Sequence, residues 1–207
     1  MKNHLELTEE IQSVCGSHYL NQFSLNESGD IILQKNSEWK IRCYESVFES
    51  LLKDSKTLFL DEMSGLHSII AKNKGVGEVF ASSGNPRHIQ LIQDLSEFKG
   101  VAVGTIPQPM VVWGEGNPLV DTDFRGSFDY VFCGNTGTYV YYKKLGQNFK
   151  DVVKSLSFYA NKGLVIQWQD VAWKEVPEDY NLESFRNICL EYYNSFIKTI
   201  DGLIILV

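Results

Sequence analysis

The residues best suited to bind a ligand in this sequence come directly after short apolar stretches. They are carboxylates, hydroxyls, amides and small residues: Asp61, Glu62, Ser64 and Gly65, then Ser82, Ser83 and Asn85, and later Cys133, Gly134, Asn135, Thr136 and Tyr139. Carboxylates and hydroxyls recognise polar ligand groups by hydrogen bonds, and glycine lets a ligand approach the backbone. If the apolar stretches are neighbouring strands, these turns form one small-molecule site.

Apolar residues recur at helical or strand spacing along most of the chain. Strands are predicted over residues 30–34, 57–61, 77–82, 101–106, 128–134, 163–169 and 203–207, and helices over 5–20, 37–54, 66–73, 86–99, 148–163 and 182–201. Asn85 is a suitable N-cap for a helix that begins at Pro86, and Gly100 is a suitable C-terminal stop. Residues 107–127 show no clear periodicity.

The predicted strands are short and almost continuously apolar, which is typical of strands that are buried on both faces. With intervening helices as crossovers, they predict an α/β fold: a doubly wound, mostly parallel, Rossmann-like sheet of six or seven strands with helices on both faces. We expect a single domain over residues 1–207, with an N-terminal extension (1–38) and a core (39–207). In such sheets the ligand lies at the carboxyl ends of the strands.

Composition excludes several classes of protein. The formal net charge of −7 argues against strong general nucleic-acid binding. The four cysteines are widely spaced without a CxxC pair, so we expect free thiols rather than a zinc site, and four scattered histidines form no metal-ligand set. No apolar run approaches the ~18 residues of a membrane span, and the N-terminus lacks an apolar signal region, so a cytoplasmic location is expected.

The order of the predicted elements and several short sequence motifs over residues 40–207 resemble those of the class I S-adenosylmethionine-dependent methyltransferases. "TLFLDEMSGLHSII" is similar to their first motif, an apolar strand followed by an acid and a glycine-rich turn. "FDYVFCGNTGTYV" is similar to their fourth motif, and "NFKDVVKSLSFYANKGLVIQWQD" to their helix, turn and fifth strand. The resemblance implies S-adenosylmethionine as cofactor and a small molecule or RNA base as methyl acceptor. The chain resembles a divergent member of this family, because its cofactor motif is degenerate.

The first motif can be matched in two ways. Without a gap, Gly65 takes the last glycine position, Phe59 replaces the family acid, and Asp61 and Met63 replace glycines. With a turn shorter by two residues, Asp61 is the acid at the strand end. We favour the second match because it places a carboxylate where it could meet an ammonium group.

Two other acids of the family are missing. Ser82, Ser83 and Asn85 stand where a carboxylate would accept hydrogen bonds from both ribose hydroxyls, and "VGTIPQ" lacks the acid that would meet the adenine amino group. The family closes with an antiparallel hairpin, whereas this chain is expected to stop after the strand over 203–207, the sixth counted from the strand over 57–61. A bound cofactor would therefore be held differently or more weakly.

The resemblance implies cofactor contacts from Asp61, Glu62, Ser64, Gly65, Ser82, Ser83, Asn85, Cys133 and Gly134, and acceptor contacts from Asn135, Thr136, Tyr139, Trp113 and Trp168. Asp61 or Glu62 could instead cap the next helix, and Asn85 could serve only as a cap. His67 and His88 are candidate general bases but are more readily explained by packing or solvation. No catalytic residue is assigned.

Three functions follow from this reading. The first is methyl transfer from S-adenosylmethionine. The second is a catalytically inactive binding or scaffold protein that has lost the cofactor site. The third, another nucleotide- or phosphate-using enzyme, ranks last because neither a Walker loop nor a GxGxxG motif is present.

Overall fold

A computed structural model describes residues 2–16, 23–33, 38–60, 62–112, 119–120, 122–134, 149–168, 178, 180–200 and 202–207. Its elements divide into two compact units, Met1–Pro109 and Met110–Val207. The first contains α1 (His4–Cys15), β1 (Phe23–Leu25), β2 (Ile31–Leu33), α2 (Glu38–Glu49), β3 (Lys56–Phe59), α3 (Leu66–Asn73), β4 (Glu78–Ser82), α4 (Pro86–Lys99) and β5 (Gly104–Ile106). The second contains β6 (Val111–Val112), β7 (Leu119–Val120), the 3₁₀ helix η2 (Thr122–Phe124), β8 (Phe128–Cys133), α6 (Phe149–Ser157), β9 (Ala160–Gln167), α7 (Leu182–Cys189), β10 (Phe196–Lys198) and β11 (Leu203–Leu206).

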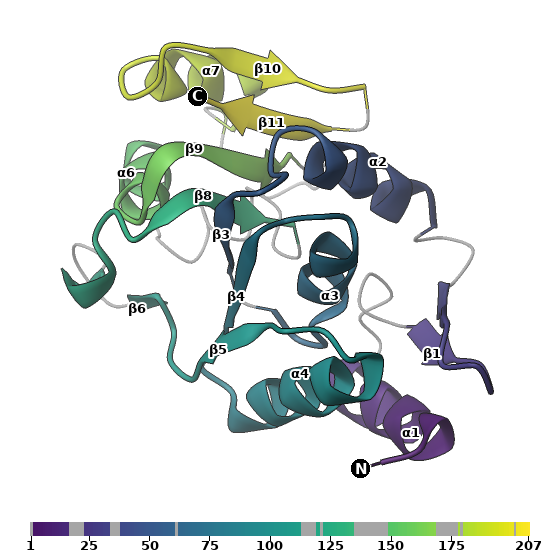
Figure 1. Cartoon of the computed structure of the whole chain (residues 1–207). Coiled ribbons are helices and arrows are strands. Elements are labelled where there is room, and N and C mark those ends of the chain that lie inside the picture. Colours follow the sequence, from purple (N-terminus) through teal and green to yellow (C-terminus); the bar gives the residue numbers. More distant parts are fainter. Residues whose placement is uncertain are drawn as a thin grey trace. The chain divides into compact units, whose positions relative to one another are not determined.

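Seven strands form one mostly parallel sheet in the order β10-β11-β9-β8-β3-β4-β5 (Figure 1). The predicted α/β, Rossmann-like sheet with flanking helices is therefore confirmed. Two smaller sheets, β1-β2 and β6-β7, are antiparallel hairpins.

In the first unit, parallel pairing brings the carboxyl ends of three strands to one edge. Phe59 of β3 lies opposite Ala81 of β4, and Ser82 of β4 lies opposite Ile106 of β5. Helix α3 packs against β4, and α4 packs against β5 and against α1. The turns after β3 and β4 therefore lie side by side, as the sequence predicts for a ligand site.

The helix boundaries in this unit follow the predicted signals closely. Asn85 accepts a hydrogen bond from the Arg87 backbone as the N-cap of α4, Pro86 is its first residue, and Gly100 ends it in a left-handed conformation with φ of 64°. Helix α3 covers the predicted span. Helix α2 ends at Glu49, earlier than predicted, because residues 50–55 turn before β3 and Lys53 bridges to Val76.

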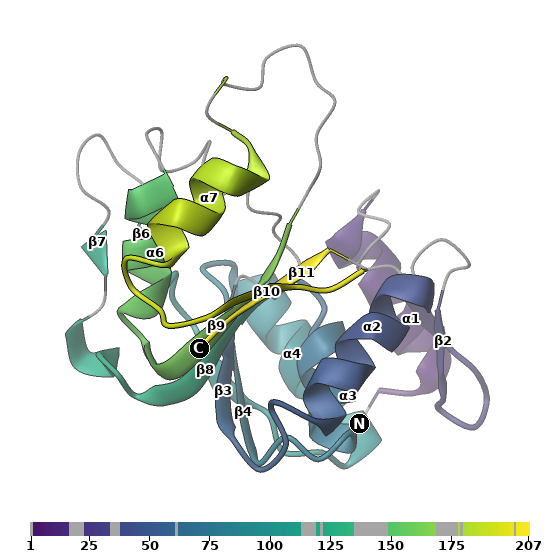
Figure 2. The same ribbon diagram turned by 90° about the horizontal axis from the view of Figure 1, so that it is seen from above.

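In the second unit, β8 and β9 are parallel, and α6 packs against β9 and α7 (Figure 2). An aromatic cluster connects these elements: the ring of Phe149 lies 5.0 Å from that of Phe185, and Trp168 stacks on Tyr180 with ring centroids 5.0 Å apart. Phe149 and Phe185 are 1% and 0% exposed, so they form part of the core of this unit.

Two predictions about the C-terminal region are wrong. The helix predicted over 182–201 ends at Cys189, and Phe196–Lys198 instead forms β10. Strand β10 pairs antiparallel with β11, which pairs antiparallel with β9, so the chain does close with an antiparallel hairpin. The spacing of Cys189, Tyr192 and Phe196 fits a helix locally, but Phe196 pairs with Leu206 across the free edge of β11.

The predicted helix over 148–163 is also too long, because α6 ends at Ser157 and β9 begins at Ala160. Short extended segments at Val111–Val112 and Leu119–Val120 occur within the region that lacked periodicity. Among the described helices, none is long and apolar enough to cross a bilayer. All four cysteines are free thiols, as predicted.

Candidate functional site

The turn between β3 and α3 carries the most unusual side chains of the first unit. Glu62 and His67 are 1% and 2% exposed, and Glu62 Oε1 lies 2.9 Å from His67 Nδ1. Ser68 Oγ donates to the Gly65 carbonyl at 2.9 Å and lies 3.5 Å from Glu62 Oε2. A buried carboxylate is tolerated only when it is paired and hydrogen-bonded, and His67 and Ser68 provide these contacts to Glu62.

Backbone hydrogen bonds fix the turn against the next strand. The Glu62 N–H donates to the Ser82 carbonyl at 3.0 Å, and the Ser83 N–H donates to the Ile106 carbonyl at 3.2 Å. These bonds continue the pairing of β3, β4 and β5 beyond the strand ends. They hold the predicted residues after β3 and β4 next to each other.

Gly65 is the N-cap of α3 and has a left-handed backbone, with φ of 73° and ψ of 8°. A Cβ at this position would lie 2.9 Å from Ile92 Cγ1 of α4. Glycine is required here for conformation and for close approach of two helices. The predicted alternative, that a carboxylate caps α3, differs from the cap observed, because Gly65 provides no side-chain hydrogen bond and Glu62 pairs with His67.

Ser64 points into a fully buried position beside Cys15 of α1. Its hydroxyl is 0% exposed and has no hydrogen-bond partner of ordinary geometry among the described residues. Burial raises the pKa of the Cys15 thiol to about 11, an effect that the nearby Ser64 hydroxyl opposes and Glu62 reinforces. No pattern in the sequence indicates this contact, because Cys15 belongs to the predicted N-terminal extension, far from Ser64 in the chain.

At the end of β4, Ser82 and Ser83 are 0% and 4% exposed. Ser82 Oγ lies 3.4 Å from the Phe59 carbonyl, whereas Ser83 Oγ lies 2.9 Å from His88 Nδ1. Asn85 Nδ2 lies 3.1 Å from His88 Nε2. His88 therefore joins the predicted pair Ser83 and Asn85, through its position on the first turn of α4.

The other predicted residues lie in the second unit or outside the part of the chain that the structure describes. Cys133 ends β8 and is 1% exposed, and Gly134 follows it at a position where an added Cβ would clash with the Phe132 ring. Trp168 is 5% exposed within the aromatic cluster of the second unit. The predicted residues outside the described part are Asp61, Trp113, Asn135, Thr136 and Tyr139.

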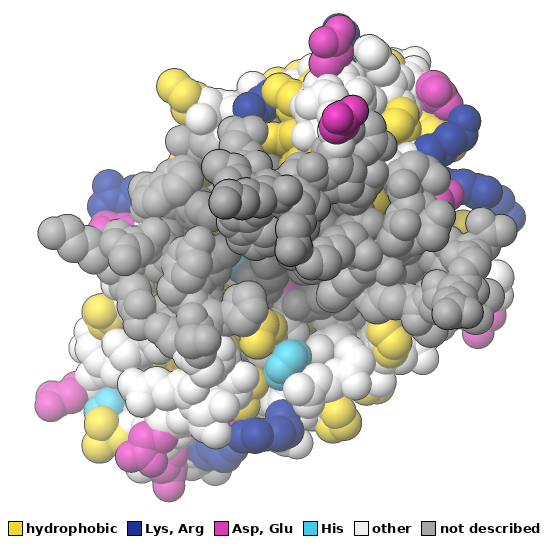
Figure 3. All heavy atoms as spheres, turned by 180° about the vertical axis from the view of Figure 1, so that it is seen from behind, with side chains coloured by type: hydrophobic (Ala, Val, Ile, Leu, Met, Phe, Trp, Pro, Cys, Tyr) yellow, Lys and Arg dark blue, Asp and Glu magenta, His cyan; other side chains and the backbone are white. Residues whose placement is uncertain are grey.

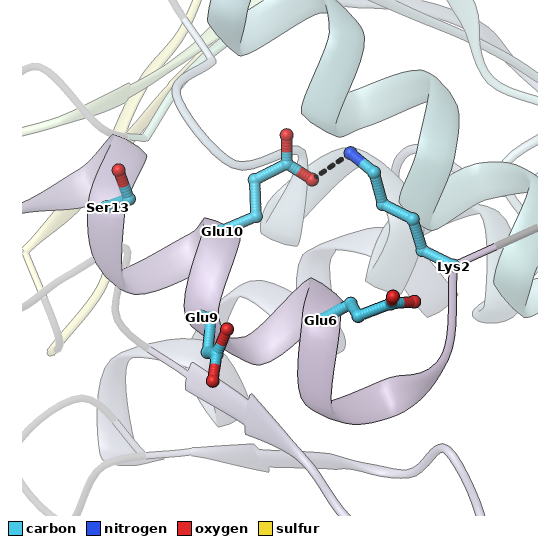
Figure 4. Close-up of a pocket in the computed structure, with 5 residues that line it drawn as sticks. All are labelled: Lys2, Glu6, Glu9, Glu10 and Ser13. Atoms are coloured by element: carbon cyan, nitrogen blue, oxygen red, sulfur yellow. Dashed lines mark hydrogen bonds and ion pairs between the residues drawn. The ribbon is translucent and has the colours of Figure 1, made fainter.

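A separate surface pocket of about 400 Å³ lies on α1, where Lys2, Glu6, Glu9, Glu10 and Ser13 line it (Figure 4). Lys2 Nζ forms ion pairs with Glu10 at 2.6 Å and with Asp94 of α4 at 2.7 Å. This pocket includes none of the predicted ligand residues. The described residues contain no cluster of three or more His, Cys, Asp or Glu side chains that could hold a metal ion.

No protein-family model matches the sequence, and no curated protein matches it. Solved structures do share its fold. The PH0226 protein from Pyrococcus horikoshii OT3 superposes with a TM-score of 0.58 at 14% identity, over 84% of this chain and 90% of that one. The ribosomal protein L11 methylase from Lactobacillus delbrueckii subsp. bulgaricus gives a TM-score of 0.50 at 11% identity, over 81% and 76% of the two chains.

P. horikoshii TYW2, solved in complex with MeSAdo, gives a TM-score of 0.50 at 12% identity, over 89% of this chain and 69% of that one. At these identities the likeness concerns the fold. The chain has the fold of the class I S-adenosylmethionine-dependent methyltransferases, with a sequence that diverges widely from the similar structures.

Proposed function

We propose that this protein is an S-adenosylmethionine-dependent methyltransferase whose acceptor is a small molecule or an RNA base. The observation that carries the proposal is the unit formed by β3, the turn with left-handed Gly65, and α3, which lies beside the end of β4 at one edge of the sheet. Ligands of open α/β sheets bind at this edge. A methylase and a MeSAdo complex are among the proteins that share the fold.

The described side chains fit an adenosyl ligand in part. Ser83 and Asn85 supply hydrogen-bonding groups after β4, and the buried hydroxyl of Ser64 has no ordinary partner. The carboxylate of Glu62 is directed at His67, so the group that would meet the cofactor's ammonium is Asp61. Ser82 and Gly65 would shape this part of the cofactor site, and Cys133 and Gly134 complete the proposed set after β8.

The bound cofactor would supply a methyl group on a sulfonium sulfur. The protein's own task would be to align the acceptor in line with that methyl group and to exclude water. We assign the acceptor contacts to Asn135, Thr136, Tyr139, Trp113 and Trp168. No general base is assigned, because His67 is buried against Glu62.

A second candidate, a catalytically inactive binding protein on the same fold, is favoured by one specific observation. The family turn brings its backbone close to the cofactor, whereas this turn contains the buried side chains of Glu62 and Ser64. Side chains that fill the turn would leave less room for the carboxypropyl end of the cofactor.

Calorimetry of the whole protein with S-adenosylmethionine and with S-adenosylhomocysteine separates the two candidates. The enzyme hypothesis predicts saturable binding of both ligands and transfer of a labelled methyl group to fractions of small molecules or of RNA. Binding without any transfer would support the inactive protein. No binding at millimolar ligand, by calorimetry and by thermal shift, would reject the methyltransferase proposal.

A further inference from the structure

The end of β4 and the first turn of α4 hold a set of hydrogen bonds that links the side chains of Ser83, Asn85 and His88. Ser83 Oγ lies 2.9 Å from His88 Nδ1, and Asn85 Nδ2 lies 3.1 Å from His88 Nε2. The Asn85 backbone N–H donates to Ser83 Oγ at 3.3 Å. Each contact limits the roles that the other atoms can take.

The orientation of the Asn85 amide is fixed by its function as a cap. Its Oδ1 accepts a hydrogen bond from the Arg87 backbone N–H at 3.0 Å, so its Nδ2, which can only donate, faces His88. His88 Nε2 must therefore be the acceptor and carry no proton. The remaining proton of the neutral imidazole lies on Nδ1 and is donated to Ser83 Oγ, whereas a doubly protonated ring would set two donors against each other.

Ser83 Oγ thus accepts two hydrogen bonds, one from His88 Nδ1 and one from the Asn85 backbone. A hydroxyl has two acceptor positions and one donor, so only the proton of Ser83 is left for another partner. Among the described residues, these two are the hydrogen bonds that Ser83 Oγ forms, and neither uses its proton. Ser83 is 4% exposed, and leaving a buried donor unpaired is costly.

We propose that His88 is a positioning residue that makes Ser83 a donor toward the ligand. The inference rests on the proposed function, and on a ribose that meets the residues after β4, as the family resemblance implies. The ligand recognised here would then present a neutral oxygen that accepts a hydrogen bond. A carboxylate in the same place would accept hydrogen bonds from the ribose hydroxyls. In this chain Ser83 instead donates a hydrogen bond to a ribose oxygen, so the polarity of the hydrogen bond is reversed.

The test compares S-adenosylhomocysteine with two kinds of ribose analogue. One kind lacks the 2′- or 3′-hydroxyl, and the other carries an amino group in place of that hydroxyl. The affinity of each analogue is measured by calorimetry, at a pH at which the amine is protonated. The ammonium group can only donate. The wild-type protein should bind the deoxy analogue at one of the two positions about two- to tenfold more weakly, the range for one neutral hydrogen bond, and the corresponding ammonium analogue more weakly still.

Two variants and one control sharpen this comparison. Ser83→Asp restores an acceptor and should reverse the preference, binding the ammonium analogue roughly tenfold more tightly than the parent through a charge-assisted hydrogen bond. His88→Leu frees the Ser83 hydroxyl to rotate and should reduce discrimination against the ammonium analogue. Ser55→Ala removes a hydroxyl of similar burial that donates to Leu52, before β3, and should leave the ratio of affinities unchanged.

A general loss of fold would weaken all probes together and leave these ratios unchanged, so the ratios report the hydrogen-bond polarity itself. If the wild-type protein binds the parent ligand and binds both ammonium analogues equally well or better, the polarity inference is overturned while the proposed function stands. If it binds no adenosyl probe, the proposed function is rejected and this inference with it.

Discussion

Residues in the turn after β3 satisfy two physical requirements, one on backbone conformation and one on buried charge. Gly65 meets a backbone demand, because its left-handed conformation lets the chain enter α3 while α4 lies close by. Glu62 and His67 meet an electrostatic demand, because each would be costly to bury without the other. Both features stabilise the first unit, and neither depends on a bound ligand.

We expect Gly65→Ala to lower the free energy of unfolding by more than Gly100→Ala does. Both glycines have positive φ, so an alanine at either one costs about 1–2 kcal/mol in backbone conformation. Only at Gly65 would the new Cβ meet a neighbour, Ile92, because nothing lies within 4 Å at Gly100. Urea unfolding of the two variants measures the difference, and equal losses would contradict the packing argument.

At the scale of elements, α1 belongs structurally to the first unit. It contributes Leu7, Ile11 and Cys15 to the buried residues, and Arg87 of α4 donates to Ser13 at 3.0 Å. Its N-terminus forms a capping box, in which Asn3 Oδ1 accepts from the Glu6 N–H and Glu6 Oε2 accepts from the Asn3 N–H at 2.8 Å. The first part of the predicted extension, His4–Cys15, is thus a packed helix.

Asn3→Ala should destabilise the protein by about 1 kcal/mol, because it leaves helix N–H groups without their acceptor. Asn3→Asp keeps an acceptor and adds negative charge at the helix N-terminus, so it should match the wild type. Thermal unfolding of the two variants checks both results. If Asn3→Ala leaves the melting temperature unchanged, α1 contributes little to the stability of the first unit.

At the scale of the whole molecule, net charge bears on the class of acceptor. The chain carries 19 basic and 26 acidic residues, and on the face seen in Figure 3 the described Lys and Arg side chains are interspersed with Asp and Glu. A broad basic surface that follows a phosphate backbone is not apparent among these residues. From the net charge of −7, we expect an RNA acceptor to be recognised mainly through a base.

We expect the affinity for single-stranded RNA without a specific site to depend weakly on salt. The slope of log K against log[salt] should be shallower than about −2 between about 50 and 200 mM, because few phosphates would be neutralised. Fluorescence anisotropy with homopolymeric RNA measures it, with duplex DNA as the control. A slope near −5 would contradict the expectation and indicate an extended phosphate-binding surface.

The helices and strands of the sheet could largely be predicted from local sequence patterns. Asn85, Pro86 and Gly100 marked the ends of α4 correctly, since caps and stops depend on neighbours in the chain. Apolar runs identified the main strands because both faces of such strands are buried. The C-terminal helix was overextended at Phe196, where pairing with a distant strand outweighed local helical spacing.

The contacts within the candidate site depend on how distant parts of the chain pack together. The sequence selected Ser83 and Asn85, yet the roles of donor and acceptor follow from His88, whose two ring nitrogens meet both residues. The burial of Glu62 against His67, and of Ser64 beside Cys15, depends on how α1, α3 and the strands pack. Residue types indicate which hydrogen bonds are possible, whereas packing decides which of them form and which groups remain for a ligand.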